Sequence, residues 1–149
     1  MCQLLRTNST NPEFITLVSL LDADLAQRDG KDHSFYAQFN GITHLNHVIV
    51  LYQNNTPVAC GAIKEYNDTT VEVKRMFVQP EHRGKGYASK VLVALENWSK
   101  ELGHKSTILE TGLRQPEAIA LYKKNGYEII DNYPPYVGIE NSVCFKKDL

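Results

Sequence analysis

The sequence predicts an α/β protein in which helices flank one mixed sheet, and two patterns of apolar residues support this fold class. Apolar residues recur at helical spacing before residue 30 and again after residue 86. Between residues 47 and 78, short apolar runs instead alternate with turn residues, which is typical of strands joined by hairpins. Both kinds of segment occur in one chain of 149 residues with 42% hydrophobic content. This length is typical of one ordinary domain, so we expect a single domain over residues 1–149.

The first predicted element is a helix in "NPEFITLVSLLDADLAQ". Asn11 is a typical N-cap residue, and Pro12 occupies the first helical position, where its missing N–H costs nothing. One helical face then carries the apolar residues Phe14, Leu17, Val18, Leu21 and Leu25. The following stretch, residues 28–44, mixes turn residues with aromatics, and we expect a loop that contains a short helix.

The middle of the chain predicts an antiparallel meander of three strands. The strand-like runs are "HVIVLYQ", "VACGAIKEY" and "VEVKRMFV", and they are separated by the turn sequences "NNTP" and "NDTT".

The remaining elements alternate between helix and strand. A helix begins near Tyr87, and Gly103 follows it at a position typical of a helix C-terminus. The strand "KSTILETG", the helix "QPEAIALYKKNG" and the strands "YEIID" and "SVCFKKDL" complete the chain. Because a strand–helix–strand connection normally joins parallel neighbours, we expect the strands ending at Val78 and near Glu110 to be parallel and to separate at their ends.

Composition argues against several classes of protein. The chain has 16 Lys and Arg against 17 Asp and Glu, so bulk charge does not favour nucleic acid or an anionic membrane as partner. The apolar runs are far shorter than the ~20 residues of a membrane helix, and the N-terminus lacks a signal-peptide core. We therefore expect a cytoplasmic protein. Cys2, Cys60 and Cys144 are widely spaced, which favours free thiols over a disulfide or a metal site.

The turn "RGKGYA" indicates a ligand that carries phosphate. Gly84 and Gly86 lack a Cβ, so backbone N–H groups can approach phosphate oxygens at the positive end of the following helix. The turn is not a Walker loop, because no Ser or Thr follows the Gly-Lys pair. Gly84, Gly86 and Ser89 approximate a dinucleotide-binding pattern, but its third glycine is absent and hairpin-linked strands precede the turn. A binding module for coenzyme A or a dinucleotide, without catalysis, stays open.

The same turn and a second segment resemble the GNAT superfamily of acetyl-CoA-dependent N-acetyltransferases. The GNAT signature is Arg or Gln, two residues, Gly, one residue, then Gly or Ala, and here it reads Arg83 to Ala88 in register. The second segment, "AIALYKKNGYEII", is similar to the family's "ALYxKxGF". The resemblance implies a mostly antiparallel central sheet, with parallel strands 4 and 5 splayed around the cofactor, and acetyl-CoA as acetyl donor without a metal.

The resemblance also assigns residues to the cofactor. The turn residues Arg83, Gly84, Lys85, Gly86, Tyr87 and Ala88 would hold the pyrophosphate of coenzyme A, chiefly through the main chain. The side chains of Arg83 and Lys85 would add positive charge there, and a solvated surface is their alternative position. The backbone of Met76, Phe77 and Val78 would bind the pantetheine arm and polarise the thioester carbonyl. Gln115 stands where many members have an Asn that contacts coenzyme A, and a helix cap beside Pro116 is its alternative role.

Two residues match catalytic positions of the family. Glu72 corresponds to the strand position that supplies the general base in histone-acetylating members, and its alternative is an exposed strand glutamate. Tyr122 matches the tyrosine that serves as general acid, and its alternative is a core residue. Glu110, at the end of the next strand, would bind the amine, steady the loop or replace Glu72 as base. His82 is expected to be a surface residue. Since no cysteine lies in either motif, we expect direct transfer in a ternary complex.

The acceptor is expected to be a small amine or an amino acid, with a protein N-terminus or lysine as the alternative. In the family, specificity comes from the loop between the first helices and from the connection of the last strands. In that connection, Tyr133 and Tyr136 flank Pro134 and Pro135 and are predicted to form a rigid wall over the acceptor. A second copy of the chain stays open as a partner.

Overall fold

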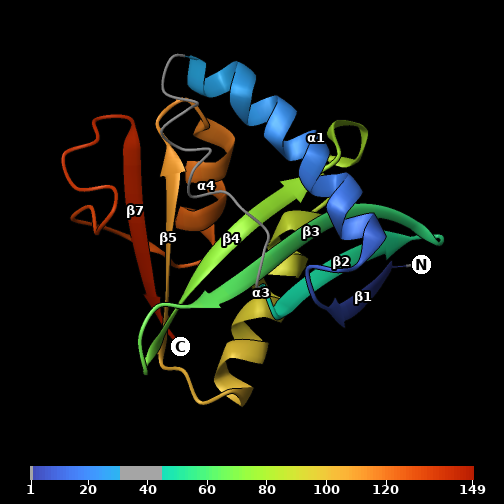
Figure 1. Ribbon diagram of the computed structural model, residues 1–149, viewed down its shortest axis with the longest axis horizontal. Coiled ribbons are helices and arrows are strands. Elements are labelled where there is room, and N and C mark those ends of the chain that lie inside the picture. The colour runs from blue at the N-terminus through green and yellow to red at the C-terminus, as the bar shows by residue number, and fades with distance from the viewer. Residues whose placement is uncertain (1, 31–44) are drawn as a thin grey trace.

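The computed structural model describes residues 2–30 and 45–149 of the chain (Figure 1). The loop and short helix predicted over 28–44 therefore fall almost entirely outside the described residues. The helices are α1 (Pro12–Asp29), α3 (Tyr87–Glu101) and α4 (Pro116–Lys124), with a short 3-10 turn, η2 (Pro80–His82). The strands are β1 (Cys2–Thr7), β2 (His47–Gln53), β3 (Thr56–Glu65), β4 (Thr70–Val78), β5 (Ser106–Gly112), β6 (Glu128–Ile130) and β7 (Ser142–Asp148).

These strands form one mixed sheet in the order β1-β2-β3-β4-β5-β7-β6. Within the described residues, β4 and β5 are the parallel pair, and the other neighbours are antiparallel. The parallel pairing runs from Thr70 opposite Ser106 to Glu72 opposite Ile108 and then stops. Beyond that point the two strands diverge, as Figure 1 shows. The predicted fold class and the parallel, splayed pair are both confirmed.

Strand β1 at the sheet edge is a difference from the sequence analysis, which assigned no element to the N-terminus. Cys2–Thr7 pairs antiparallel with β2 along its whole length. Its sequence, "CQLLRT", does not alternate, and both Leu4 and Leu5 are exposed at this edge. A strand whose faces are both largely exposed carries no period-two pattern, so the usual signal for a strand is missing.

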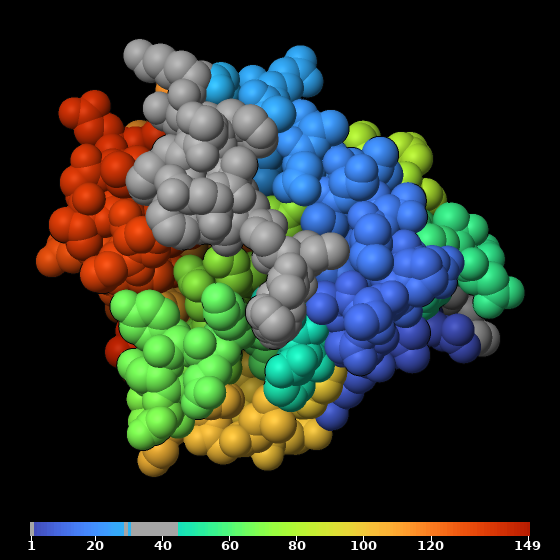
Figure 2. Space-filling model, in the orientation of Figure 1, coloured from blue at the N-terminus to red at the C-terminus, as the bar shows by residue number. Residues whose placement is uncertain are grey.

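Helices cover both faces of the sheet, and alternate strand residues divide accordingly. Val48 and Val50 of β2 pack with α1, whereas Ile49 and Leu51 pack with α3 and α4. Figure 1 shows α1 in front of the sheet and α3 behind it. Figure 2 presents the α1 face, with the C-terminal residues on its left side. None of the helices described is long and apolar enough to cross a membrane.

The predicted helix ends are present. The Asn11 side chain accepts hydrogen bonds from the backbone N–H groups of Glu13 (2.9 Å) and Phe14 (3.0 Å), as an N-cap does. After α3 the chain turns at Gly103, whose φ of 90° is left-handed and therefore favours glycine.

Candidate functional site

The first feature of the site is a β-bulge on β4. Cys60 pairs with Phe77 but Ala62 pairs with Lys74, so Arg75 and Met76 together lie opposite Gly61 alone. Arg75 has a φ of 59°, which is rare for a residue with a side chain, and its buried guanidinium forms an ion pair with Asp22 of α1. A bulge bends its strand and frees backbone polar groups from the ladder. This one lies just beyond the point where β4 and β5 stop pairing.

Close packing behind the bulge requires Gly61. A Cβ at this position would lie 2.5 Å from Met76 Sδ and 2.9 Å from side-chain atoms of both Val91 and Leu95. Helix α3 and the Met76 side chain therefore contact the backbone of β3 directly. Met76 can take this position only because residue 61 is a glycine.

Two cavities meet at the gap between β4 and β5. The turn cavity, about 400 Å³, extends along the end of β4, the Arg83–Ala88 turn and α4. The carboxylate cavity, about 110 Å³, extends between Glu72 of β4 and Glu110 of β5. The residues that line both are Leu21, Met76, Gln115, Ala118 and Tyr122. The two cavities are therefore adjacent, with Met76 and Tyr122 among the residues that they share.

The turn cavity contains nearly all the residues that the sequence analysis assigned to the cofactor. Those that line it are Met76, Phe77, Val78, Arg83, Gly84, Gly86, Tyr87, Ala88 and Gln115, whereas Lys85 does not. Gly84 and Gly86 each have a φ of 80°, and no heavy atom lies within 4 Å of a Cβ built on either. Gly86 is the N-cap residue of α3 and has no side chain that could accept hydrogen bonds from the helix. The first backbone N–H groups of α3 are therefore available to a ligand. This arrangement is suited to an anion.

Arg83 connects the turn to the neighbouring elements. Its Nε donates a hydrogen bond to the Val78 carbonyl oxygen at 2.9 Å, and its guanidinium lies 3.7 Å from the Asp24 carboxylate of α1. Asp24 also pairs with Arg28 at 3.2 Å, and Arg28 pairs with Glu117 of α4. Charged residues of α1 and α4 thus meet beside the turn cavity. Sequence reasoning missed them, although the Asp24 and Arg28 spacing is a recognisable helical ion pair.

His82 differs from its prediction. It was expected to be a surface residue, but it is partly buried and lines the turn cavity. Its ring centroid lies 6.5 Å from that of Tyr87. The 3-10 turn η2 carries it back toward the start of α3.

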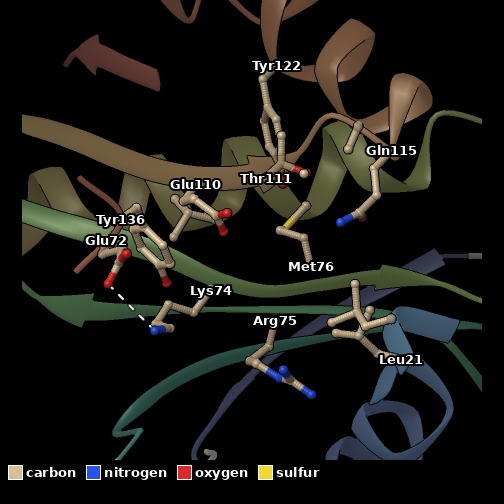
Figure 3. A pocket seen from close by; sticks show the side chains of 14 residues that line it. Leu21, Glu72, Lys74, Arg75, Met76, Glu110, Thr111, Gln115, Tyr122 and Tyr136 are labelled. Atoms are coloured by element: carbon tan, nitrogen blue, oxygen red, sulfur yellow. Dashed lines mark ion pairs between the residues drawn. The ribbon is translucent and has the colours of Figure 1, made fainter. Parts of the chain in front are cut away.

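Tyr122 of α4 lies where the two cavities meet. Only 6% of the residue is exposed, and its ring packs against those of Tyr127 and Phe145. Figure 3 shows it reaching from α4 toward β5. Burial, and secondarily the negative charge of Glu110, raises the pKa of the Tyr122 phenol. The hydroxyl therefore keeps its proton at neutral pH and can act as a hydrogen-bond donor.

The carboxylate cavity combines side chains from the two separating strands. Glu72 lies opposite Ile108, so Glu110, two residues further along β5, projects from the same face of the sheet. The Glu72 side chain is only 13% exposed, so the alternative of an exposed strand glutamate was wrong. Lys74 of β4 lines the same cavity, and its Nζ lies 3.7 Å from Glu72 Oε1 (Figure 3). Sequence reasoning had not singled out Lys74.

The two predicted tyrosines take different positions. Tyr136 lines the carboxylate cavity with Glu72 and Glu110. Tyr133 lies behind it and donates a hydrogen bond from its hydroxyl to Glu72 Oε2 at 2.7 Å. Their rings pack edge to face, with centroids 5.7 Å apart, and Tyr66 contacts Tyr133 in the same way. The connection before β7 therefore supplies one wall residue and one residue that fixes Glu72.

The cysteines do not line either cavity, although Cys144 pairs with Glu110 across β5 and β7. Cys2, Cys60 and Cys144 are free thiols. Burial raises the pKa of Cys60 to about 12 and that of Cys144 to about 11, so both are protonated at neutral pH. Across residues 2–30 and 45–149, no group of three or more His, Cys, Asp or Glu side chains is arranged to hold a metal ion.

Comparisons with known proteins identify relatives of this chain. The model of the "Acetyltransferase (GNAT) family" matches residues 14–127. An "IAA acetyltransferase" of Azospirillum brasilense is 38% identical over 102 residues, which is 68% of this chain and 67% of that protein. An "Uncharacterized N-acetyltransferase YjgM" of Escherichia coli is 42% identical over 60 residues, 40% of this chain and 36% of the relative.

Solved structures extend the likeness to the whole described fold. A Klebsiella pneumoniae protein provisionally assigned to the acyl-CoA N-acyltransferases has a TM-score of 0.84 at 30% identity, covering 100% of this chain and 98% of its own. The PaiA N-acetyltransferase of Thermoplasma acidophilum, solved with coenzyme A, has a TM-score of 0.75 at 14% identity, covering 100% and 99%. At that identity the second likeness concerns the fold alone.

Proposed function

Because this chain belongs to the GNAT family of acetyltransferases and is an acyltransferase, we propose that it transfers the acetyl group of acetyl-CoA directly to a primary amine of a small molecule or amino acid. One observation carries this proposal: the turn cavity and the carboxylate cavity meet beside Tyr122 and Met76. Two substrates bound side by side need no covalent enzyme intermediate. The small carboxylate cavity, about 110 Å³, favours a small acceptor.

Acetyl-CoA occupies the turn cavity in this proposal. The amides at the start of α3, and the open space above Gly84 and Gly86, fit a pyrophosphate. Backbone groups that the bulge at Arg75 and Met76 frees from pairing lie where a pantetheine arm would pass between β4 and β5. The match of residues 14–127 to the acetyltransferase (GNAT) family model supports acetyl-CoA as this ligand.

Residues of this chain carry out the two proton transfers of the reaction. An amine attacks only when neutral, so the acceptor ammonium gives up a proton to a carboxylate, and we assign this role to Glu72. Its Oε2 already accepts the Tyr133 hydrogen bond at 2.7 Å, which fixes the carboxylate facing the cavity. Tyr122 donates its proton toward the departing sulfur as the carbon–sulfur bond breaks. Its raised pKa keeps that proton in place until then.

A thiol-release assay of the purified protein tests this function. Acetyl-CoA is mixed with a panel of primary amines, amino acids and peptides that carry a free N-terminus or lysine. We expect free thiol to accumulate only when an acceptor is present, and most rapidly with small acceptors. Binding of acetyl-CoA without thiol release from any acceptor would identify a binding module instead.

A further inference from the structure

The carboxylate cavity carries a positive charge that amine acetylation does not require. Lys74 is largely buried, with 12% of its side chain exposed. Its Nζ forms an ion pair with Glu72 Oε1 at 3.7 Å. Glu72 and Glu110 bring two negative charges to this cavity, and Lys74 balances one of them. The lysine therefore gives the cavity a position for a negatively charged group of the substrate, beside the position for the amine.

The neighbouring arginine does not share this role. The Arg75 side chain is 2% exposed, and its guanidinium forms an ion pair with Asp22 of α1. Its charge is thus matched within the fold. Lys74 differs from Arg75 because a carboxylate with which it forms an ion pair, that of Glu72, also lines the cavity.

Lys74 and Glu110 lie at the same level on opposite sides of the gap. The last parallel pair joins Glu72 to Ile108, and Lys74 and Glu110 each follow two residues later on the same face. Figure 3 shows the two side chains on facing strands, beside Met76. The positive and negative groups therefore line opposite walls of one small cavity.

Glu110 and Tyr122 both line the carboxylate cavity. Figure 3 shows Tyr122 reaching toward β5, the strand that carries Glu110, and the negative charge of Glu110 helps to raise the pKa of the Tyr122 phenol. An ammonium group held at Glu110 would lie beside Tyr122, where the proposed function puts the thioester. A carboxylate on the same molecule would then face Lys74.

From this pairing we infer that the acceptor is a zwitterion, an amino acid whose carboxylate binds Lys74 and whose amino group binds Glu110. The inference rests on the proposed function and narrows its acceptor class. The substrate carboxylate takes over from Glu72 as the partner of Lys74. Glu72, still held by Tyr133, then faces the amine that it deprotonates.

Matched acceptor pairs test this inference by thiol release from acetyl-CoA. Each pair consists of an amino acid and the amine that lacks its carboxylate, such as alanine with ethylamine and phenylalanine with phenethylamine. For the amino acid that reacts faster of the two, we expect kcat/KM to be at least about tenfold higher than for the amine of the same pair. A tenfold difference in kcat/KM corresponds to about 1.4 kcal/mol. Lys74→Met should close this gap, and Lys100→Met, at an exposed position of α3, should preserve it.

The outcomes separate the inference from the function on which it rests. Equal rates within every pair, or faster reaction of the amines, would overturn the zwitterion assignment and leave acetyl transfer intact. A gap that persists in Lys74→Met would also overturn it. No thiol release from either class would overturn both the acceptor assignment and the proposed function.

Discussion

The two cavities that meet at Tyr122 are built in different ways. The turn cavity relies on backbone conformation: two glycines at φ 80°, the first turn of α3 and the end of β4. The carboxylate cavity relies on side chains from separate segments, with Glu72 and Lys74 on β4, Glu110 on β5 and Tyr136 before β7. A backbone site suits one invariant ligand, whereas a side-chain site can change with its residues. Substitutions in the turn cavity should therefore change cofactor affinity, and substitutions in the carboxylate cavity should change turnover.

The largest effect on cofactor affinity is expected at the turn. Gly86→Glu introduces a side chain at φ 80° and a negative charge beside the proposed pyrophosphate, so coenzyme A affinity should fall at least about 100-fold, or about 2.7 kcal/mol. Isothermal titration calorimetry measures this. Gly103→Glu is the matched control, because Gly103 has a φ of 90°, similar open space, and no contact with the turn cavity. Equal affinity in Gly86→Glu and wild type, or tighter binding of NAD than of coenzyme A, would remove the cofactor assignment.

Tyr122→Phe should affect turnover instead of affinity. Loss of the hydroxyl should lower kcat by roughly 10² to 10⁴, with little change in the Kd of acetyl-CoA. Since burial and Glu110 raise the Tyr122 pKa, the wild-type rate should not decline from phenol ionisation below about pH 10, the ordinary tyrosine value.

Tyr127→Phe is the matched control for Tyr122. It removes a buried hydroxyl that donates to Glu96 at 2.9 Å and contacts Thr107 Oγ1 at 2.7 Å, but it lies outside both cavities. It should lower the free energy of unfolding by about 1–3 kcal/mol and leave kcat close to wild type. A similar loss of kcat in both variants would indicate that Tyr122 is a packing residue.

Sequence and structure differ most where a residue's role depends on distant segments. The glycine turn, α3 and the parallel strands were predictable, because each rests on local backbone chemistry or on one crossover connection. The position of Lys74 opposite Glu110 was not predictable, because it depends on where the parallel pairing of β4 and β5 stops. The Tyr133 hydrogen bond to Glu72 spans 61 residues and has no local pattern at all.

The two carboxylates of the side-chain cavity are distinguished by their pH profiles. Glu72→Gln retains an acceptor for the Tyr133 hydroxyl but cannot take up a proton, so the acid limb of the kcat/KM profile should weaken and the rate fall by about 10². Glu110→Gln should mainly raise the KM of the acceptor. Should Glu110→Gln abolish the pH dependence while Glu72→Gln keeps it, the base is Glu110. Labelled acetyl retained on the protein without an amine would refute direct transfer.

The smallest effect is expected at Tyr133. Tyr133→Phe removes the hydrogen bond to Glu72 but keeps the ring contacts with Tyr66 and Tyr136. We expect kcat to fall by less than about tenfold and the free energy of unfolding to fall by about 1 kcal/mol. Double-mutant kinetics with Glu72→Gln check the reason, because the effect of Tyr133→Phe should shrink when Glu72 is already replaced. Fully additive losses would contradict a role through Glu72.

The position of bound acetyl-CoA in a crystal structure tests the central claim most directly. We predict the pyrophosphate against the amides of the Arg83–Ala88 turn, the pantetheine arm between β4 and β5, and the thioester sulfur beside the Tyr122 hydroxyl at the junction of the two cavities. The acetyl group should face Glu72 and Glu110. A cofactor bound elsewhere, or one whose thioester lies away from Tyr122 and the carboxylate cavity, would contradict the account.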